Sequence, residues 1–155
     1  MPELKAKPVR ASLTYLSDLM SPPDANAYGS VFGGKILAMI DKAAAVCAMR
    51  HAAQPCVTVA MDRVEFMVPI FVTDLVTVEA RINYAGKTSM EIGVEVFSEN
   101  MAKGTRVHTN ACLVTMVAVT KDRKPARVPG LILETPGDKS RYAAAVARRK
   151  ARSRA

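Results

Sequence analysis

The sequence predicts an α+β domain in which one long central helix is wrapped by an antiparallel sheet of five to six strands. Residues 35–54 contain no proline or glycine and much alanine, methionine and leucine, a composition typical of a helix. After Gln54-Pro55 the hydrophobic period changes to two, which is typical of strands. The helix is apolar almost all round, so we expect a curved sheet to bury it.

The expected elements follow one another in a simple order. Residues 12–19 alternate as a strand, 22–34 form a turn-rich loop, and the central helix comes next. Strands are then predicted at 56–68, 72–84, 89–98 and 105–120, with a hairpin turn at 85–88. The last strand is so apolar that burial on both faces is expected, by the helix on one side and by a partner subunit on the other. On the middle two strands the inward-facing side chains are predicted to be Val76, Val78, Ala80, Ile82, Tyr84, Met90, Ile92, Val94 and Val96.

Length and composition suit one globular domain, since half of the 155 residues are hydrophobic. We expect a flexible N-terminus at 1–10, the folded domain at 11–122, and a linker with a short basic C-terminal helix or tail at 123–155. The helix in this last part is predicted at 141–152. Neither a secretory signal nor a membrane span is predicted, so a cytoplasmic location is expected. Cys47, Cys56 and Cys112 are predicted to be free thiols, and the two histidines lack ligand neighbours, so no metal site is expected.

The net charge of +8 lies mostly at the C-terminal end. Residues 139–155 hold seven Lys or Arg and no acid, whereas residues 1–138 hold 15 Lys or Arg against 14 Asp or Glu. An anion-binding site would therefore involve this stretch, although Arg148, Arg149 and Lys150 could equally form a solvated tail. Tyr142 is its only aromatic residue, which argues against nucleic-acid binding.

Asp41 is the residue of the helix that most needs an explanation. Lys35, Lys42 and Arg50 share one narrow edge of the helix, and Asp41 lies on the other side among apolar residues. A buried carboxylate is costly unless it is paired or used in chemistry. Asp41 is therefore either a catalytic group or a structural partner of Arg63 or of a backbone amide.

Several motifs carry a family resemblance. The loop Asp-Ala-Asn-x-x-Gly-x-Val-Phe-Gly-Gly at 24–34 runs into Ile-Leu-x-x-Ile-Asp-x-Ala-Ala at 36–44, and the segments 56–66, 86–92 and 145–152 continue the pattern. Together these resemble the acyl-CoA thioesterases of the hotdog fold, most closely the short bacterial acyl-CoA hydrolases related to the animal cytosolic acyl-CoA thioesterases. The resemblance covers most of residues 11–152.

The resemblance implies a site for acyl-CoA hydrolysis built at a dimer interface. Asp41 would act as general base or nucleophile and Asn26 would position water or the thioester. The amides of Gly33 and Gly34, at the helix N-terminus, would hold the oxyanion. The alternatives are purely structural roles, in which Asn26 is an ordinary loop cap and the glycines allow a tight turn. Coenzyme A, as substrate and product rather than cofactor, would be bound by Val59, Ala60, Met61, Lys87, Thr88, Ser89, Met90, Arg149 and Lys150.

Other functions and finer details stay open at this point. The same fold could serve as a non-catalytic acyl-CoA sensor, although the presence of both Asp41 and Asn26 disfavours that. A dehydratase is less expected, because His51 near the far end of the helix is the only histidine on the loop or helix. The chain is expected to form a homodimer or a trimer of dimers. Acyl-chain length, nucleotide regulation and the choice between base and nucleophile cannot be read from the residues.

Overall fold

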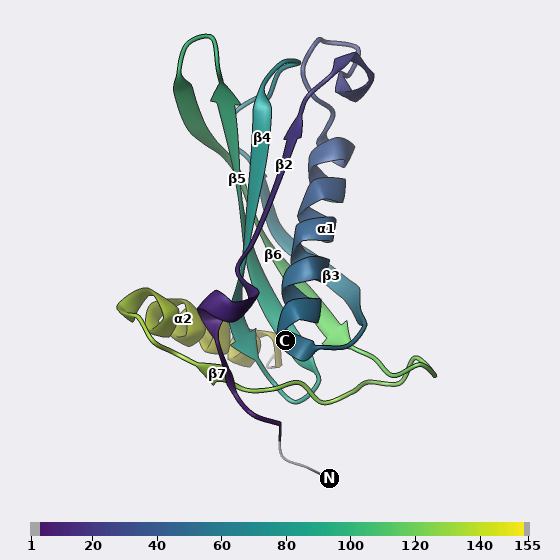
Figure 1. Cartoon of the computed structure of the whole chain (residues 1–155), viewed down its shortest axis with the longest axis vertical. Coiled ribbons are helices and arrows are strands. Elements are labelled where there is room, and N and C mark those ends of the chain that lie inside the picture. Colours follow the sequence, from purple (N-terminus) through teal and green to yellow (C-terminus); the bar gives the residue numbers. More distant parts are fainter. Residues whose placement is uncertain (1–3, 154–155) are drawn as a thin grey trace.

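A computed structural model describes residues 4–153 of the chain and contains one main sheet and two long helices (Figure 1). The five strands of the antiparallel sheet lie in the order β2-β4-β5-β6-β3. Their bounds are β2 Thr14–Leu19, β3 Cys56–Phe66, β4 Leu75–Ala85, β5 Ser89–Asn100 and β6 Thr105–Ala118. The helices are α1, Gly33–Ala52, and α2, Pro136–Ser153. Two short 3-10 helices occupy Val9–Ser12 and Pro22–Asp24, and β1, Lys7–Pro8, pairs in parallel with β7, Leu131–Ile132.

The core lies between α1 and the inner face of the sheet. Residues spaced three and four apart on α1, such as Ile36, Ile40 and Ala44, are fully buried there. The predicted inward-facing residues of β4 and β5 are confirmed by their burial, with the exception of Tyr84. The prediction is wrong for Tyr84, because the ladder with β5 shifts between Ile82 and Tyr84 and the ring lies on the outer face of the sheet, against Tyr142 of α2. The predicted helix and strands are therefore present, with ends that differ by a few residues.

The expectation that the sheet wraps α1 is wrong for the single chain. The sheet covers only one side of α1, so Ala38 and Met49 on the opposite side are exposed. The outward face of β6, which we expect a partner subunit to cover, is partly open in the single chain, because Thr105–His108 are exposed and the outward-facing residues further along are half-buried. Both surfaces lie outside the one core that a single sheet and helix can form.

Helix α2 packs on the outer face of the sheet, on the side away from α1 (Figure 1). Arg148 forms two hydrogen bonds with Glu91 of β5, Nε to Oε1 at 2.9 Å and Nη2 to Oε2 at 2.7 Å. The hydrogen bond with Glu91 raises the pKa of Arg148. Tyr142 packs against Tyr84, with ring centroids 5.3 Å apart. The basic C-terminal stretch is therefore a docked helix rather than a solvated tail.

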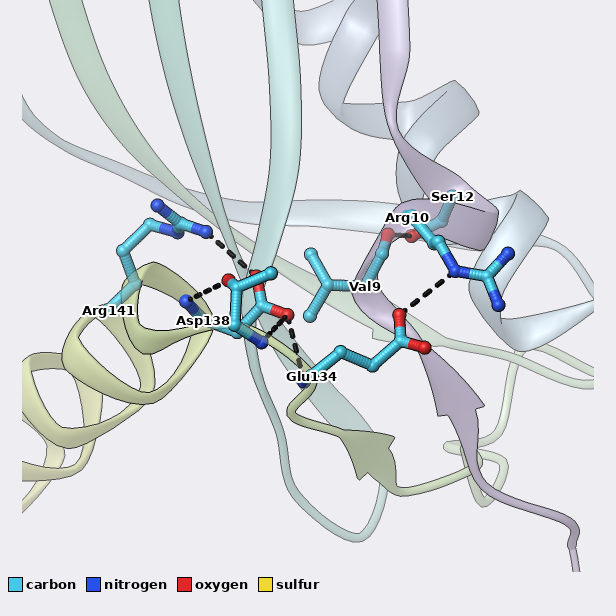
Figure 2. A network of polar contacts seen from close by, with 7 residues as sticks. Val9, Arg10, Ser12, Glu134, Asp138 and Arg141 are labelled. Atoms are coloured by element: carbon cyan, nitrogen blue, oxygen red, sulfur yellow. Dashed lines mark hydrogen bonds and ion pairs between the residues drawn. The ribbon is translucent and has the colours of Figure 1, made fainter.

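The start of α2 differs from the prediction, which placed the helix at 141–152. The helix begins at Pro136 because Thr135 and Asp138 form a capping arrangement (Figure 2). The Asp138 carboxylate accepts hydrogen bonds from the amides of Glu134 and Thr135, and the Thr135 hydroxyl accepts one from the Asp138 amide. Burial raises the pKa of Asp138, but these bonds and Arg141 lower it further, so its pKa lies below the usual value.

The first described residues are also more structured than a flexible lead-in. Strand β1 pairs with β7, and Arg10 forms an ion pair with Glu134 at 2.9 Å, just before α2 (Figure 2). On the same side of the molecule, His51 of α1 bonds to the carbonyl of Pro129 at 2.7 Å. Burial lowers the pKa of His51, so the imidazole is neutral near pH 7 and donates from Nε2. The two ends of the described chain are thus tied to each other and to α1.

The three cysteines are free, as predicted. Burial raises the pKa of each thiol to about 11. Within residues 4–153, no helix is long and apolar enough to cross a membrane.

Candidate active site

The loop before α1 is held in one shape by Asp24. Its carboxylate accepts hydrogen bonds from the amide and hydroxyl of Ser21 and an ion pair from Lys35 at 3.4 Å. The amide of Ser21, together with Lys35, holds the pKa of Asp24 below its usual value. The Asp24 carbonyl also accepts the Phe32 amide at 3.0 Å. These contacts fix the point at which the chain enters the helix.

Asn26 organises the tip of the same loop. Its Oδ1 accepts hydrogen bonds from the amides of Tyr28 at 2.8 Å and Ser30 at 3.2 Å, and its Nδ2 donates to the Ser30 hydroxyl at 2.9 Å. Within one chain the hydrogen bonds of Asn26 are therefore those of a loop cap, the structural role given as the alternative to catalysis. The neighbouring Gly29 has a φ of 88°, a left-handed conformation that glycine adopts without strain.

Gly33 and Gly34 open α1 at an uncapped N-terminus. No side chain hydrogen bonds at the cap position, Phe32, and the first turn contains no acidic residue. The helix dipole and its free amides therefore favour an incoming negative charge. Added side chains would crowd this end, since a Cβ on Gly33 would lie 3.3 Å from the Phe66 ring and one on Gly34 would lie 3.1 Å from the Phe32 ring.

Asp41 lies two turns further along α1 and contacts β3. The hydroxyl of Thr58 donates a hydrogen bond of 2.5 Å to Asp41 Oδ1. The side chain of Asp41 is half-buried rather than buried, and its partner is neither Arg63 nor a backbone amide. The Asp41–Thr58 pair therefore sits at the border between the core and the open side of the helix.

One chain does not bring the predicted catalytic residues together. Asp41 follows Gly33 by eight residues, which corresponds to about 12 Å along the helix axis. Asn26 and Asp41 share no hydrogen bond in the described part of the chain. The contacts within one chain therefore do not link the two predicted catalytic residues.

Strand β3 is the edge of the sheet beside this pair. Val57, Val59 and Phe66 expose 47%, 61% and 54% of their surface on it. The ladder with β6 skips Val59 between Thr58 and Ala60, and the side chain of Val59 faces solvent. An apolar, unpaired edge strand is a ready template for pairing with another chain.

The residues expected to bind coenzyme A fall into three groups. Ser89 and Arg149 meet, with Arg149 Nη1 donating to the Ser89 hydroxyl at 2.9 Å while its guanidinium lies 5.0 Å from the Tyr84 ring. Lys87, Lys150 and Val59 are exposed, and Ala60, Met61 and Thr88 are half-buried. Met90 is 1% exposed and its side chain belongs to the core.

Two pockets flank the sheet. The larger, about 350 Å³, lies between α2 and the outer face of the sheet among arginine and glutamate side chains, and no candidate catalytic residue lines it. The smaller, about 280 Å³, lies beside the N-terminus of α1 and includes Gly33, Phe66 and Asn110 in its lining. The smaller pocket is the one next to the candidate oxyanion amides. Within residues 4–153, no group of three or more His, Cys, Asp or Glu residues could hold a metal ion.

Sequence reasoning missed Thr58 and Asn110. Thr58 carried no signal, because the strand pattern alone does not say that it faces Asp41. Asn110 did carry one, since it is a polar residue at an inward-facing position of an otherwise apolar strand.

Comparison with known proteins decides the family. The thioesterase superfamily model matches residues 28–105. Protein VdlD of Helicobacter pylori is 40% identical over 139 residues, which are 90% of this chain and 79% of that protein. The chain belongs to the hotdog-fold acyl-CoA thioesterases.

Two solved structures are similar to this chain over almost its whole length. A hexameric acyl-CoA thioesterase, solved in its apo form, is 40% identical, with a TM-score of 0.93 and coverage of 97% of each chain. An acyl-CoA hydrolase of Staphylococcus aureus, solved with butyryl coenzyme A and coenzyme A, is 34% identical, with a TM-score of 0.85 and coverage of 96% of this chain and 92% of that one.

The Staphylococcus aureus protein has also been solved as three single alanine variants. The substituted residues are an asparagine, an aspartate 15 residues later and a threonine 17 residues after that.

Proposed function

We propose that this chain hydrolyses acyl-CoA to a free carboxylic acid and coenzyme A, with Asp41 as the general base or nucleophile. The observation that carries the proposal is the hydrogen bond between Thr58 and Asp41, on the open side of α1 beside an unpaired strand. A half-buried carboxylate held by one hydroxyl is oriented and still accessible. Those are the properties that a base or nucleophile needs.

The spacing of the residues supports the same assignment. Asn26, Asp41 and Thr58 are separated by 15 and 17 residues, the spacing of the three positions substituted in the Staphylococcus aureus hydrolase. Two of these residues were expected from the loop and helix motifs. Thr58 joins them through its contact with Asp41.

We infer that each site is shared between two subunits joined through β3. Antiparallel pairing of two copies of β3 about their midpoint lays the Thr58 end of one strand beside the Phe66 end of the other. Phe66 borders Gly33. Asp41 and Thr58 of one subunit then approach the helix N-terminus and Asn26 of the other. Three such dimers would give a hexamer, the state of the solved relative.

The reaction then follows from where charge develops. With Asp41 as base, its carboxylate takes a proton from water while the oxygen adds to the thioester carbon. The carbonyl oxygen becomes an oxyanion next to the amides of Gly33 and Gly34, where one donor is worth about 10²–10³ in rate. The C–S bond breaks as the intermediate collapses, and the proton passes from Asp41 to the departing thiolate.

Coenzyme A would lie along the hairpin and α2. Arg149 and Ser89 already form one polar cluster, and the exposed ammonium groups of Lys87 and Lys150 would add positive charge for the phosphates. Arg148 is less suited to this role, because its Nε and Nη2 are engaged by Glu91.

The test is Asp41→Asn, assayed by thiol release from acyl-CoA of several chain lengths. We expect kcat to fall by about 10²–10⁴-fold, since the base or nucleophile is lost. The melting temperature and coenzyme A affinity should stay close to those of the unchanged chain. Asp122→Asn, at an exposed turn after β6, is the matched control and should keep full activity. Unchanged turnover by Asp41→Asn would refute the proposal, and binding without thiol release by the unchanged chain would indicate an acyl-CoA sensor.

A further inference from the structure

We propose that Asn110 selects acyl groups that carry a hydroxyl near the thioester, by accepting a hydrogen bond from that hydroxyl. The inference rests on the proposed hydrolysis and names the class of acyl group that the site favours. It comes from one buried, unsatisfied atom of a residue that lines an otherwise apolar pocket.

The pocket beside the N-terminus of α1 has the size and position for the first part of an acyl chain. Its volume is about 280 Å³, and Gly33, whose amide is proposed to hold the thioester oxygen, is part of its lining. Of the eight lining residues, only Asn110 has a polar side chain. Hydrocarbon therefore fits these walls, and a charged substituent would be buried without a partner.

Asn110 comes from β6 and is 1% exposed. Its Nδ2 donates a hydrogen bond of 3.1 Å to the carbonyl of Glu65. This bond fixes the orientation of the amide, because turning it over would set two oxygens against each other. The Oδ1 atom is buried and receives no hydrogen bond from any residue of 4–153.

An unpaired buried acceptor is unfavourable, and most such atoms have a partner in native proteins. A ligand group that pairs with Oδ1 would be a donor and would be uncharged, since no lining side chain could balance a charge. A hydroxyl on the acyl chain meets both conditions. A plain acyl chain fills the pocket but leaves Oδ1 unpaired, so the two kinds of substrate differ by one buried hydrogen bond.

The experiment compares kcat/KM for plain and hydroxylated thioesters of equal length. The pairs are butyryl-CoA against its 2-hydroxy and 3-hydroxy forms, and hexanoyl-CoA against the same two forms. We expect at least one hydroxylated form to be favoured by about tenfold or more over its plain counterpart. Asn110→Leu should remove this preference, because it keeps the side-chain size and deletes the acceptor. Thr109→Val is the matched control, since it deletes a buried hydroxyl outside the pocket and should keep the preference.

Two results would overturn the inference. One is an unchanged chain that hydrolyses the plain thioesters without preferring any hydroxylated form, a result that does not depend on whether Asn110→Leu folds. The other is a folded Asn110→Leu variant that keeps the preference. In both cases the proposed hydrolysis itself stands. It fails only if none of the thioesters is hydrolysed, and the inference then fails with it.

Discussion

The hydroxyl of Thr58 fixes the direction of the Asp41 carboxylate through a bond of 2.5 Å. The bond engages only Oδ1 of the carboxylate. A hydroxyl in this place adjusts where the carboxylate points without neutralising its charge. Thr58 is thus a positioning residue in the proposed reaction rather than a group that reacts.

Thr58→Val tests this role. We expect kcat to fall by about tenfold, the value of one lost hydrogen bond of about 1.4 kcal/mol, with little change in stability. Thr58→Ser keeps the hydroxyl and should recover most of the loss, which a purely structural role for the γ-methyl would not allow. Steady-state hydrolysis of one acyl-CoA by the three proteins provides the comparison. Equal rates for Thr58→Val and the unchanged chain would remove Thr58 from the site.

The candidate site could be predicted in part at this scale. Asp41 stood out because it is one carboxylate on an apolar face, a property of the sequence alone. The exposure of the Asp41 side chain could not be predicted from the sequence, since its burial depends on how far the sheet reaches around α1. The contact with Thr58 depends on where β3 lies against the helix, and the open acceptor of Asn110 depends on a bond to the distant Glu65 carbonyl.

The element that depends most on one contact is α2. The Glu91 carboxylate, 7% exposed, is paired on both oxygens by Arg148, and Asn83 donates a further hydrogen bond to it at 3.2 Å. Loss of Arg148 would leave the negative charge of Glu91 buried without its ion-pair partner. The pair therefore fixes where the helix lies more than it adds stability.

Arg148→Met should lower the free energy of unfolding by about 3 kcal/mol, because it leaves the Glu91 charge buried and unpaired. Adding Glu91→Leu should restore most of that loss by removing the charge as well. Arg152→Met is the control, since Arg152 and Asp62 form an exposed pair at 3.4 Å worth less than about 1 kcal/mol. Urea unfolding of the four proteins measures these differences. Equal losses for Arg148→Met and Arg152→Met would contradict the account.

The elements themselves were the most predictable part of the fold. The periods of 3.6 and two residues identified α1, β4 and β5 correctly, because their burial follows directly from those patterns. The early start of α2 was also readable, since Thr135-Pro136-Gly137-Asp138 has a capping spacing with proline at the first helical position. The burial of Glu91 could not be predicted from the sequence. It results from the docking of α2, which lies far along the chain from Glu91.

At the scale of the whole molecule, the proposed arrangement divides each site between two chains. The helix N-terminus with Asn26 would form one half, and Asp41 with Thr58 of the other chain would form the second. Within one chain Gly33 and Asp41 lie about 12 Å apart along the axis of α1. Pairing through the edge strand β3 is the arrangement that we propose brings complementary halves together.

Mixing two inactive variants tests this arrangement. We expect Asp41→Asn and Asn26→Ala each to be nearly inactive, and a refolded equal mixture to regain about one quarter of full activity. Half of the dimers are then mixed, and one of the two sites in each mixed dimer has both residues intact. Thiol release from the refolded mixture, compared with each variant refolded alone, gives the measurement. A mixture no more active than the separate variants would place both residues in the same chain's site.

The open edge of β3 also affects how a newly synthesised chain behaves before it assembles. Its unpaired amides and carbonyls, with valine and phenylalanine side chains exposed beside them, form a surface to which other extended segments can add. Unassembled subunits would therefore aggregate instead of remaining as dispersed monomers. This is expected on dilution, and also when the protein is produced faster than it assembles. Keeping concentration high enough for association, yet synthesis slow enough for correct encounters, is the practical condition for handling this polypeptide.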